Sequence, residues 1–263
     1  MLRVSIPRMH LPELEDEGWL PSSLRNALRD LLRTATEVIS PYDRMAGRLA
    51  HAVRASGATN IIDLCSGSGG PAVRLRRQLD QAGCHVPITL TDLYPDPETW
   101  GDIRQRAGEG VRYVETPTDA TAVPEHLTGF RTLFTAFHHF RPEQARQILV
   151  DAVTRRQGIA VFEQTERRLA PMLGTLTYIP LTLLAMPFVR PFRLSRLVWT
   201  YFPPVTPIYA WWEGFASCWR SYTLAEMEAM LGSLPPNDYV WEMARQPSIP
   251  AGVTYLIGYP PAR

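Results

Sequence analysis

The chain has 263 residues, a formal net charge of +1 and three cysteines. This length is sufficient for one sizeable α/β domain, alone or with an insertion. The near-neutral charge argues against a nucleic-acid partner held by bulk electrostatics. Cys65, Cys84 and Cys218 have no metal-like spacing and are too few for a disulfide framework. We therefore expect no bound metal. The first residues lack the apolar run of a signal peptide, so we expect a cytoplasmic protein.

Two helices are expected before the first strand. Ser22 and Ser23 can cap the first helix, whose apolar residues recur at helical spacing. After Pro41 the pattern predicts a second helix from Tyr42 to Ala55. We interpret residues 1–57 as an N-terminal helical cover.

The stretch from Ile61 to Gly70 organises the rest of the chain. An apolar run that contains Asp63 predicts a strand, and a turn rich in glycine and serine and then a helical pattern follow it. Glycines can adopt positive φ and leave room for a ligand on the backbone, and the N–H groups of a helix N-terminus attract polar or anionic atoms. In an open α/β sheet, ligands bind beyond the carboxyl ends of the strands. The turn is therefore a candidate ligand site.

Two fingerprints compete for this turn. Gly67-x-Gly69-x-x-Ala72, with Asp92 at the end of the next strand, fits the dinucleotide pattern. Because Asp63 lies inside the preceding strand, the segment instead resembles motif I of the class I S-adenosylmethionine (SAM) dependent methyltransferases. Cys65, Gly67 and Gly69 occupy the three glycine positions of that motif, and Cys65 departs from it. The resemblance implies a Rossmann-like fold and SAM as the cofactor.

The resemblance also implies roles for residues after the later strands. Asp92 corresponds to the motif II acid that binds the ribose hydroxyls, and Leu93 to a side chain that packs on the adenine. Asp119 and Ala120 match a pair that contacts the adenine, although Asp119 could also act as a helix N-cap. Tyr42 would line the pocket or belong to the core, and Arg44 is a weaker candidate. The full expected SAM-binding set is Asp63, Cys65, Gly67, Gly69, Asp92, Leu93, Asp119, Ala120, Phe134 and Tyr42.

The remaining strands complete the expected fold. Further strands are predicted at residues 86–93, 111–114, 130–136 and 158–163, with helices between them, and a last pair at 239–243 and 253–259. By the resemblance, the final strand is antiparallel in an otherwise parallel sheet. We expect an α/β, doubly wound, seven-stranded sheet built from residues 58–165 and 222–263.

Three polar residues are candidates for catalysis. For an oxygen or nitrogen acceptor, methyl transfer requires removal of a proton, and a histidine has a suitable pKa range. His138 and His139 follow the fourth strand, and Glu163 ends the fifth. If the two histidines lay on an extended segment, they would point in opposite directions, and we prefer His139. They could instead only shape the loop.

Residues 166–221 interrupt the alternation of strands and helices. No charged residue occurs between Leu169 and Val189, and residues 199–219 are rich in Trp, Tyr and Phe. The first tract is as long as a membrane span, about 20 residues, but prolines interrupt it. We favour an apolar, mostly helical cap over the active site. The second alternative is a membrane-surface element at residues 169–219, where arginines beside Trp and Tyr suit a bilayer interface. The third alternative is a transmembrane helix.

The same segment contains the expected substrate contacts and could also form a homodimer interface. The aromatic surface of residues 199–219 could form a homodimer interface. Paired tryptophans are also common in cores. The substrate candidates are Trp211, Trp212, Glu213, Arg220 and Tyr222.

The leading hypothesis is a SAM-dependent methyltransferase that moves a methyl group by in-line displacement to a small apolar or lipophilic acceptor. A nicotinamide-dependent oxidoreductase is the first alternative. Asp63 and Asp119 argue against it, and the chain contains no lysine and hence no Tyr-x-x-x-Lys dyad. The second alternative is a non-catalytic SAM-binding or membrane-associated protein. The acceptor atom is not defined by the sequence.

Overall fold

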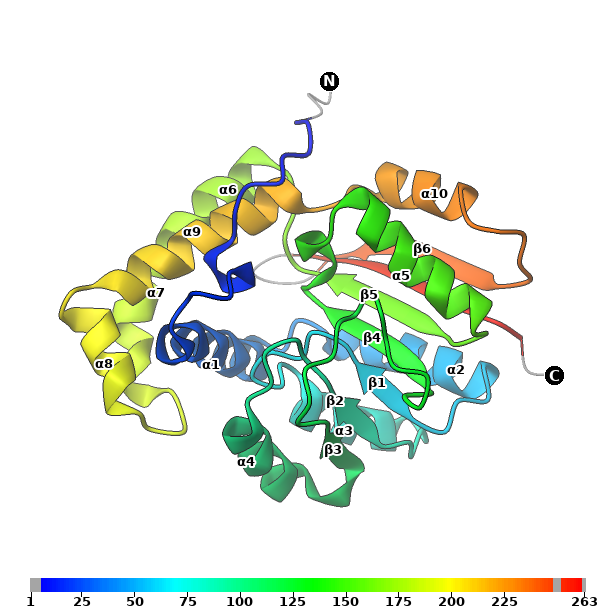
Figure 1. Cartoon of the computed structure of the whole chain (residues 1–263), viewed down its shortest axis with the longest axis horizontal. Helices are drawn as coiled ribbons and strands as arrows, with labels where there is room; N and C mark the ends of the chain where they lie inside the picture. Colours follow the sequence, from blue (N-terminus) through cyan, green and yellow to red (C-terminus); the bar gives the residue numbers. More distant parts are fainter. Residues whose placement is uncertain (1–5, 248–251, 262–263) are drawn as a thin grey trace. The chain divides into compact units, whose positions relative to one another are not determined.

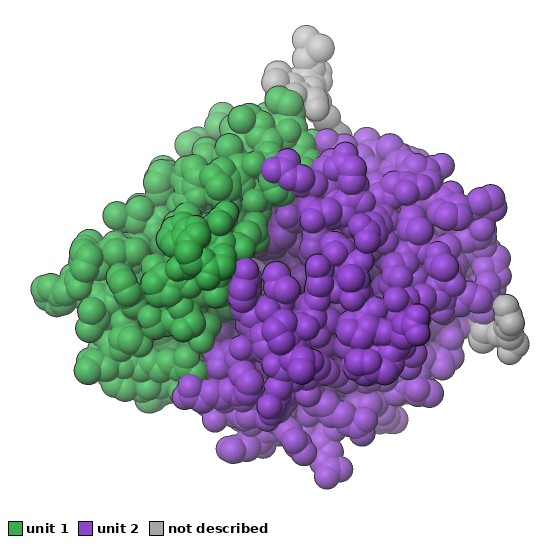
Figure 2. Space-filling model, viewed as in Figure 1, with its two compact units in different colours: residues 1–35, 165–223 green, residues 36–164, 224–263 purple. Residues whose placement is uncertain are grey.

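The computed structural model describes residues 6–247 and 252–261 (Figure 1). The N-terminal residues 1–5, where we expected no signal peptide, therefore lie outside the described part. The chain divides into two compact units (Figure 2). The first, which we call the helical unit, combines residues 1–35 with 165–223; the second, the sheet unit, combines 36–164 with 224–263. The expected cover at 1–57 is thus divided after residue 35.

The sheet unit contains one seven-stranded sheet in the order β3-β2-β1-β4-β5-β7-β6. Its strands are β1 (Ile61–Asp63), β2 (Ile88–Leu90), β3 (Val111–Tyr113), β4 (Phe130–Phe134), β5 (Ile159–Glu163), β6 (Val240–Gln246) and β7 (Val253–Tyr259). Ile61 of β1 pairs in parallel with Ile88 and Phe130, whereas Ile159 of β5 pairs antiparallel with Gly258 of β7. The predicted fold class, with one antiparallel last strand, is confirmed.

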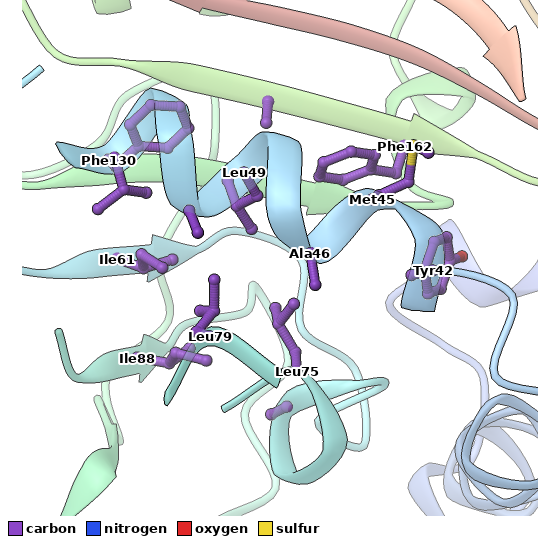
Figure 3. Close-up of a cluster of buried hydrophobic side chains, with 14 of the residues drawn as sticks. Tyr42, Met45, Ala46, Leu49, Ile61, Leu75, Leu79, Ile88, Phe130 and Phe162 are labelled. Atoms are coloured by element: carbon purple, nitrogen blue, oxygen red, sulfur yellow. The ribbon is translucent and has the colours of Figure 1, made fainter. Parts of the chain in front are cut away.

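One apolar core covers one face of this sheet (Figure 3). The helices of the sheet unit are α2 (Ala46–Ala55), α3 (Ala72–Gln81), α4 (Pro97–Ala107), α5 (Pro142–Thr154) and α10 (Leu224–Gly232), with short 3-10 turns η2 (Asp43–Met45), η3 (Gly108–Gly110) and η4 (Phe137–His139). Leu49 of α2 and Leu75 of α3 pack in the same cluster as Ile61 and Phe162 of the strands. Each such side chain contributes roughly 1.5–3 kcal/mol when it is fully buried.

The other face of the sheet is also covered. Alternate residues of a strand point to opposite faces, so Ile62, Leu133 and Val161 face away from that first core. All three are fully buried. Helix α5, whose buried side includes Ile148 and Leu149, lies on the near side of the sheet in Figure 1. Since both faces are covered, the carboxyl edge of the parallel strands is the place where polar side chains can gather.

The helical unit consists of helices and 3-10 turns in its described residues. They are η1 (Leu14–Asp16), most of α1 (Ser22–Ile39), α6 (Leu169–Gly174), η5 (Thr175–Thr177), α7 (Tyr178–Ala185), η6 (Met186–Phe188), α8 (Leu194–Tyr201) and α9 (Val205–Arg220). Helix α9 contacts α6, α7 and α8. Gly214 of α9 allows this approach, because a Cβ there would lie 2.4 Å from Cε2 of Tyr178. Among the described residues, one helical stretch, Leu169–Phe188, is long and apolar enough to span a membrane.

Candidate active site

The carboxyl edge of the parallel strands brings the predicted acidic residues into one region. Asp63 ends β1, Asp92 follows β2, and Glu163 ends β5. All three are buried. Burial is the main cause that raises the pKa of Asp63 and of Tyr42; the charge of Asp92 adds to it at Asp63, and the charges of Glu163 and Asp63 add to it at Tyr42. A buried group of acids at this edge matches the place where α/β folds bind ligands.

The turn after β1 contains several residues in the left-handed region of backbone space. Cys65 has φ +58°, Gly67 +53° and Gly69 +86°. Cys65 therefore adopts the conformation that glycine tolerates best, which explains why the resembled motif has glycine there. At Gly69 a side chain is excluded twice, by its φ and because a Cβ would lie 2.2 Å from Cδ1 of Ile103. Helix α4 thus packs directly on the turn.

Asp92 is bonded to this turn. Its Oδ2 accepts a hydrogen bond from the backbone N–H of Gly67 at 2.8 Å, and its Oδ1 accepts one from Tyr94 N at 2.8 Å. Each carboxylate oxygen can accept more than one hydrogen bond. Asp92 therefore lies against the turn, where a carboxylate can bind hydroxyl groups of a ligand.

Asp63 lies beneath the same turn. Its Oδ2 accepts from Ser66 Oγ and its Oδ1 from Thr132 Oγ1, both at 2.7 Å. Burial raises the pKa of Asp63 to about 6, although the two hydroxyl donors lower it. Ser66 and Thr132 were not predicted, since an isolated serine or threonine in the sequence gives no signal of such pairing.

The expected adenine contacts differ in their surroundings. Leu93 is half exposed and Ala120 is buried. Asp119 is exposed, and its Oδ1 accepts hydrogen bonds from N and Oγ1 of Thr121 at 2.8 and 2.7 Å. These bonds form a turn rather than a helix N-cap, so the capping interpretation is wrong. The adenine role of Asp119 stays a prediction.

Aromatic rings pack at the end of β4. The ring of Phe134 lies 4.9 Å from that of Tyr42 and 5.0 Å from that of Phe162. The Tyr42 hydroxyl lies 2.6 Å from Oγ1 of Thr135, and burial raises the pKa of Tyr42 above its usual value. Tyr42 therefore belongs to the core and also contacts the end of β4.

Thr135 is a site residue that the sequence did not reveal. Its φ is +48°, which is strained for a β-branched residue. Its Oγ1 also accepts from the backbone N–H of Gln164 at 3.2 Å. The strained residue thus joins the ends of β4 and β5 immediately before the two histidines.

His138 and Glu163 form a buried pair. Nδ1 of His138 lies 2.8 Å from Oε2 of Glu163, whose Oε1 accepts from the backbone N–H groups of Phe137 and His138 at 2.7 and 3.3 Å. The carboxylate of Glu163 therefore contacts both the imidazole of His138 and the turn that carries it, and its expected role as a base stays a prediction. With Nδ1 donating to the carboxylate, Nε2 is the nitrogen that can accept a proton.

The expectation of an extended segment at the histidines is wrong. Phe137, His138 and His139 form the 3-10 turn η4, and the imidazole rings of His138 and His139 stack with centroids 4.5 Å apart. The two side chains therefore do not point in opposite directions. The carboxylate contacts the ring of His138, while the preference for His139 stays a prediction.

The predicted substrate residues of the helical unit anchor its N-terminal segment. Nε of Arg220 donates to Leu11 O at 2.6 Å, and the guanidinium pairs with Asp16 and with buried Glu13. Oε1 of Glu213 accepts from Leu14 N at 2.7 Å, and burial with the nearby acids Glu13 and Glu15 raises its pKa to about 9. The charge of Arg220 is therefore already matched by carboxylates of the chain itself.

The aromatic substrate candidates have similar structural contacts. Trp212 donates to Pro12 O at 2.9 Å, and the guanidinium of Arg8 lies 4.1 Å from the ring centroid of Tyr222. The ring of Trp211 lies 6.2 Å from that of Phe215. The sequence could not show the contacts of Trp212 and Tyr222, because their partners Pro12 and Arg8 are about 200 positions away in the chain.

No known protein-family model and no curated protein matches the sequence. Among solved structures, the chain resembles a provisionally assigned O-methyltransferase from Nostoc punctiforme, at 14% identity and a TM-score of 0.50 over 88% of this chain and 59% of that one. It also resembles the plantazolicin methyltransferase solved with SAH, at 11% identity and 0.50 over 94% and 96% of the two chains.

A third structure that this chain resembles is described with a different enzymatic activity. It is a provisionally assigned Zn-dependent alcohol dehydrogenase from Rhodobacter sphaeroides, at 15% identity and a TM-score of 0.51 over 91% and 98% of the two chains. The chain spans about 60% of the length of the first two O-methyltransferase structures. At these identities the likeness shows the fold alone, which this chain shares with structures described as methyltransferases and with one described as an alcohol dehydrogenase.

Proposed function

We propose that this protein is a SAM-dependent methyltransferase that acts on a hydroxyl group of a small molecule. The observation that carries the proposal is the arrangement around the turn after β1, where Asp92 binds the backbone of Gly67 and buried Asp63 lies beneath. A neighbour of the same fold, the plantazolicin methyltransferase, is described in complex with SAH. The residues of this chain also fit such a ligand.

The fit rests on the donors and acceptors at the turn. Asp92 would accept hydrogen bonds from ribose hydroxyls, and the carboxylate of Asp63 would favour the positively charged methionine half of SAM. Ser68 Oγ, in the turn itself, is buried without a hydrogen-bond partner, so it can bond a polar ligand atom. Leu93 would provide apolar surface for the adenine. SAM itself supplies a methyl group activated by its sulfonium.

His138 is the proposed general base. Glu163 holds the imidazole in the tautomer whose Nε2 accepts a proton. Nε2 would take the proton of the acceptor hydroxyl while the methyl group passes from the sulfonium of bound SAM to the acceptor oxygen. The preference for an oxygen acceptor is supported by the O-methyltransferases of the same fold.

The acceptor is proposed to be small and apolar or lipophilic. This part of the proposal is supported by the apolar composition of residues 169–189. The interpretation of residues 166–221 as a cap that binds the acceptor stays a prediction, as does a cytoplasmic location.

The test is calorimetric titration of the full chain with SAM and SAH, with NADH as the comparison ligand. We expect both sulfur ligands to bind, and Asp92→Asn to weaken them about tenfold or more, since a hydrogen bond to a charged group contributes about 1.5–3 kcal/mol. The matched control is Asp102→Asn, at an exposed position of α4. Binding of NADH without SAM would overturn the proposal in favour of a nicotinamide enzyme.

A further inference from the structure

The stretch from Leu169 to Phe188 exposes most of its large apolar side chains to solvent. It runs through α6, η5, α7 and η6. Large exposed side chains recur at three- or four-residue intervals along most of it: Leu169, Leu173, Leu176, Leu181, Leu184 and Phe188. Met172, Thr175 and Thr182 lie on the opposite, buried side. Surface helices normally bury their apolar face, so here the more apolar face is the exposed one.

A second exposed apolar row lies on the neighbouring helix. Leu194, Val198 and Phe202 occur at four-residue spacing on and just after α8, and each is exposed, Phe202 at 82%. Residues at this spacing lie on one face of a helix. Helix α8 contacts α7. We call the two rows together the exposed apolar face.

The segment that contains this face is rich in arginine. Residues 167–212 contain five arginines and no acidic residue, while the whole chain has a net charge of only +1. Two of the five, Arg168 and Arg190, are exposed, and Arg168 also pairs with the neighbouring Glu166, whereas Arg196 is buried against Asp30. Leucine and phenylalanine beside exposed arginine are the composition of a helix that lies in the interface of an anionic membrane.

The same charge argues against a second copy of the chain as the occupant. A two-fold interface places the same patch on both partners, so the arginines of residues 167–212 would meet each other without an acid from that segment. A transmembrane arrangement also fits poorly. The other side of α7 packs against α9, which contains buried Glu213 and Arg220, and charged side chains are costly inside a bilayer.

We infer that the helical unit binds the surface of anionic membranes through the exposed apolar face. Leu169, Leu173, Leu176, Leu181, Leu184 and Phe188 enter the boundary between headgroups and acyl chains, together with the row on α8. Arg168 and Arg190 contact the anionic headgroups. The inference does not depend on the proposed methyltransferase activity, because it uses residues outside the sheet unit.

The test is sedimentation of the full chain with vesicles of phosphatidylcholine, alone or mixed with phosphatidylglycerol. We expect binding to the mixed vesicles that weakens with salt. Leu173→Gln with Leu184→Gln should reduce binding at least tenfold, and Arg190→Gln about fivefold, the effect expected for one arginine near an anionic surface. Because these side chains are exposed, the variants should keep the melting temperature of the parent chain.

Matched control variants distinguish binding through this face from non-specific hydrophobic or electrostatic binding. Val38→Gln removes an exposed apolar side chain of α1, and Arg77→Gln removes an exposed arginine of α3; both should bind like the parent. Three results would overturn the inference. They are no binding to the mixed vesicles, binding that resists alkaline carbonate extraction as an integral protein does, and a lipid-free dimer that the double glutamine variant dissociates.

Discussion

Asp63 is a carboxyl group whose buried environment raises its pKa. Burial raises its pKa from 3.8 to about 6, so in the folded chain it is largely protonated below pH 6. Because the folded pKa lies above the unfolded one, the stability that this group contributes is fully present below about pH 4 and is lost as the pH rises through about 6. A positively charged ligand bound near Asp63 should instead favour the ionised carboxylate.

We therefore predict that SAM affinity falls as the pH is lowered below about 6, by up to about tenfold per pH unit. The reason is that a proton must leave Asp63 before the carboxylate can favour the cationic ligand. Calorimetry between pH 5 and pH 8 measures the effect, and Asp63→Asn should bind more weakly with a flat profile. An affinity of the parent chain that does not vary over this range would contradict the role given to Asp63.

Cys65 combines a side chain with a backbone conformation that suits glycine. At φ +58° a β-branched residue is more strained than cysteine. We predict that Cys65→Val lowers the free energy of unfolding by about 1–2 kcal/mol, the cost of one residue in a sparsely populated region, whereas Cys65→Gly keeps or increases it. Urea denaturation of the two variants makes the comparison. Equal stability of both would show that the turn can change its conformation.

The histidine pair gives a third prediction at this scale. His138→Gln should lower kcat by about 10²–10⁴-fold, the usual contribution of a general base, and leave SAM affinity unchanged. Glu163→Gln should also lower kcat and shift the pH profile, since it acts by orienting the imidazole. His139→Gln should cost less than His138→Gln, and His126→Gln, at an exposed position, is the control. A larger loss at His139 would restore the original preference.

At the scale of elements, the contact between α7 and α9 depends on one glycine. A Cβ at Gly214 would lie 2.4 Å from Tyr178 Cε2 and 2.9 Å from its Cδ2. We predict that Gly214→Val destabilises the chain by about 1–3 kcal/mol, as overpacking does. Gly174→Ala is the control, because φ at Gly174 is −59° and no atom lies within 4 Å of its added Cβ. Thermal unfolding followed by circular dichroism measures both.

At the scale of the whole molecule, each unit combines segments that are distant in the sequence. The helical unit joins residues 1–35 to 165–223, and Arg220 on α9 holds residues 11–16 of the other segment. Arg220 and Glu13 are both buried. The helical unit therefore depends on an ion pair that spans most of the chain.

We predict that Arg220→Ala destabilises the protein by about 3–5 kcal/mol, because it leaves the carboxylate of Glu13 buried without its cation. Denaturation monitored by tryptophan fluorescence should report the loss, since Trp19, Trp199, Trp211, Trp212 and Trp219 all belong to the helical unit. Arg168→Ala removes only an exposed pair with Glu166 and should change stability by less than about 1 kcal/mol. Similar small effects at both positions would contradict the anchoring role.

The sequence by itself determined the sheet. Apolar runs, glycine turns and the positions of Asp63 and Asp92 are local patterns, and they predicted the fold and the acidic edge of the sheet because parallel strands bring their carboxyl ends together. The strand limits were less accurate, since the second strand was expected at residues 86–93 and spans Ile88–Leu90.

Only the tertiary structure decided the roles that depend on distant partners. The stacking of His138 on His139, the orientation of His138 by Glu163, the strained backbone of Thr135 and the attachment of Arg220 to Glu13 all join groups or set angles that no local pattern encodes. The exposure of the apolar face of residues 169–188 was likewise not encoded in a local pattern. Composition marked the segment as apolar, but only packing against α9 decided which side faces solvent.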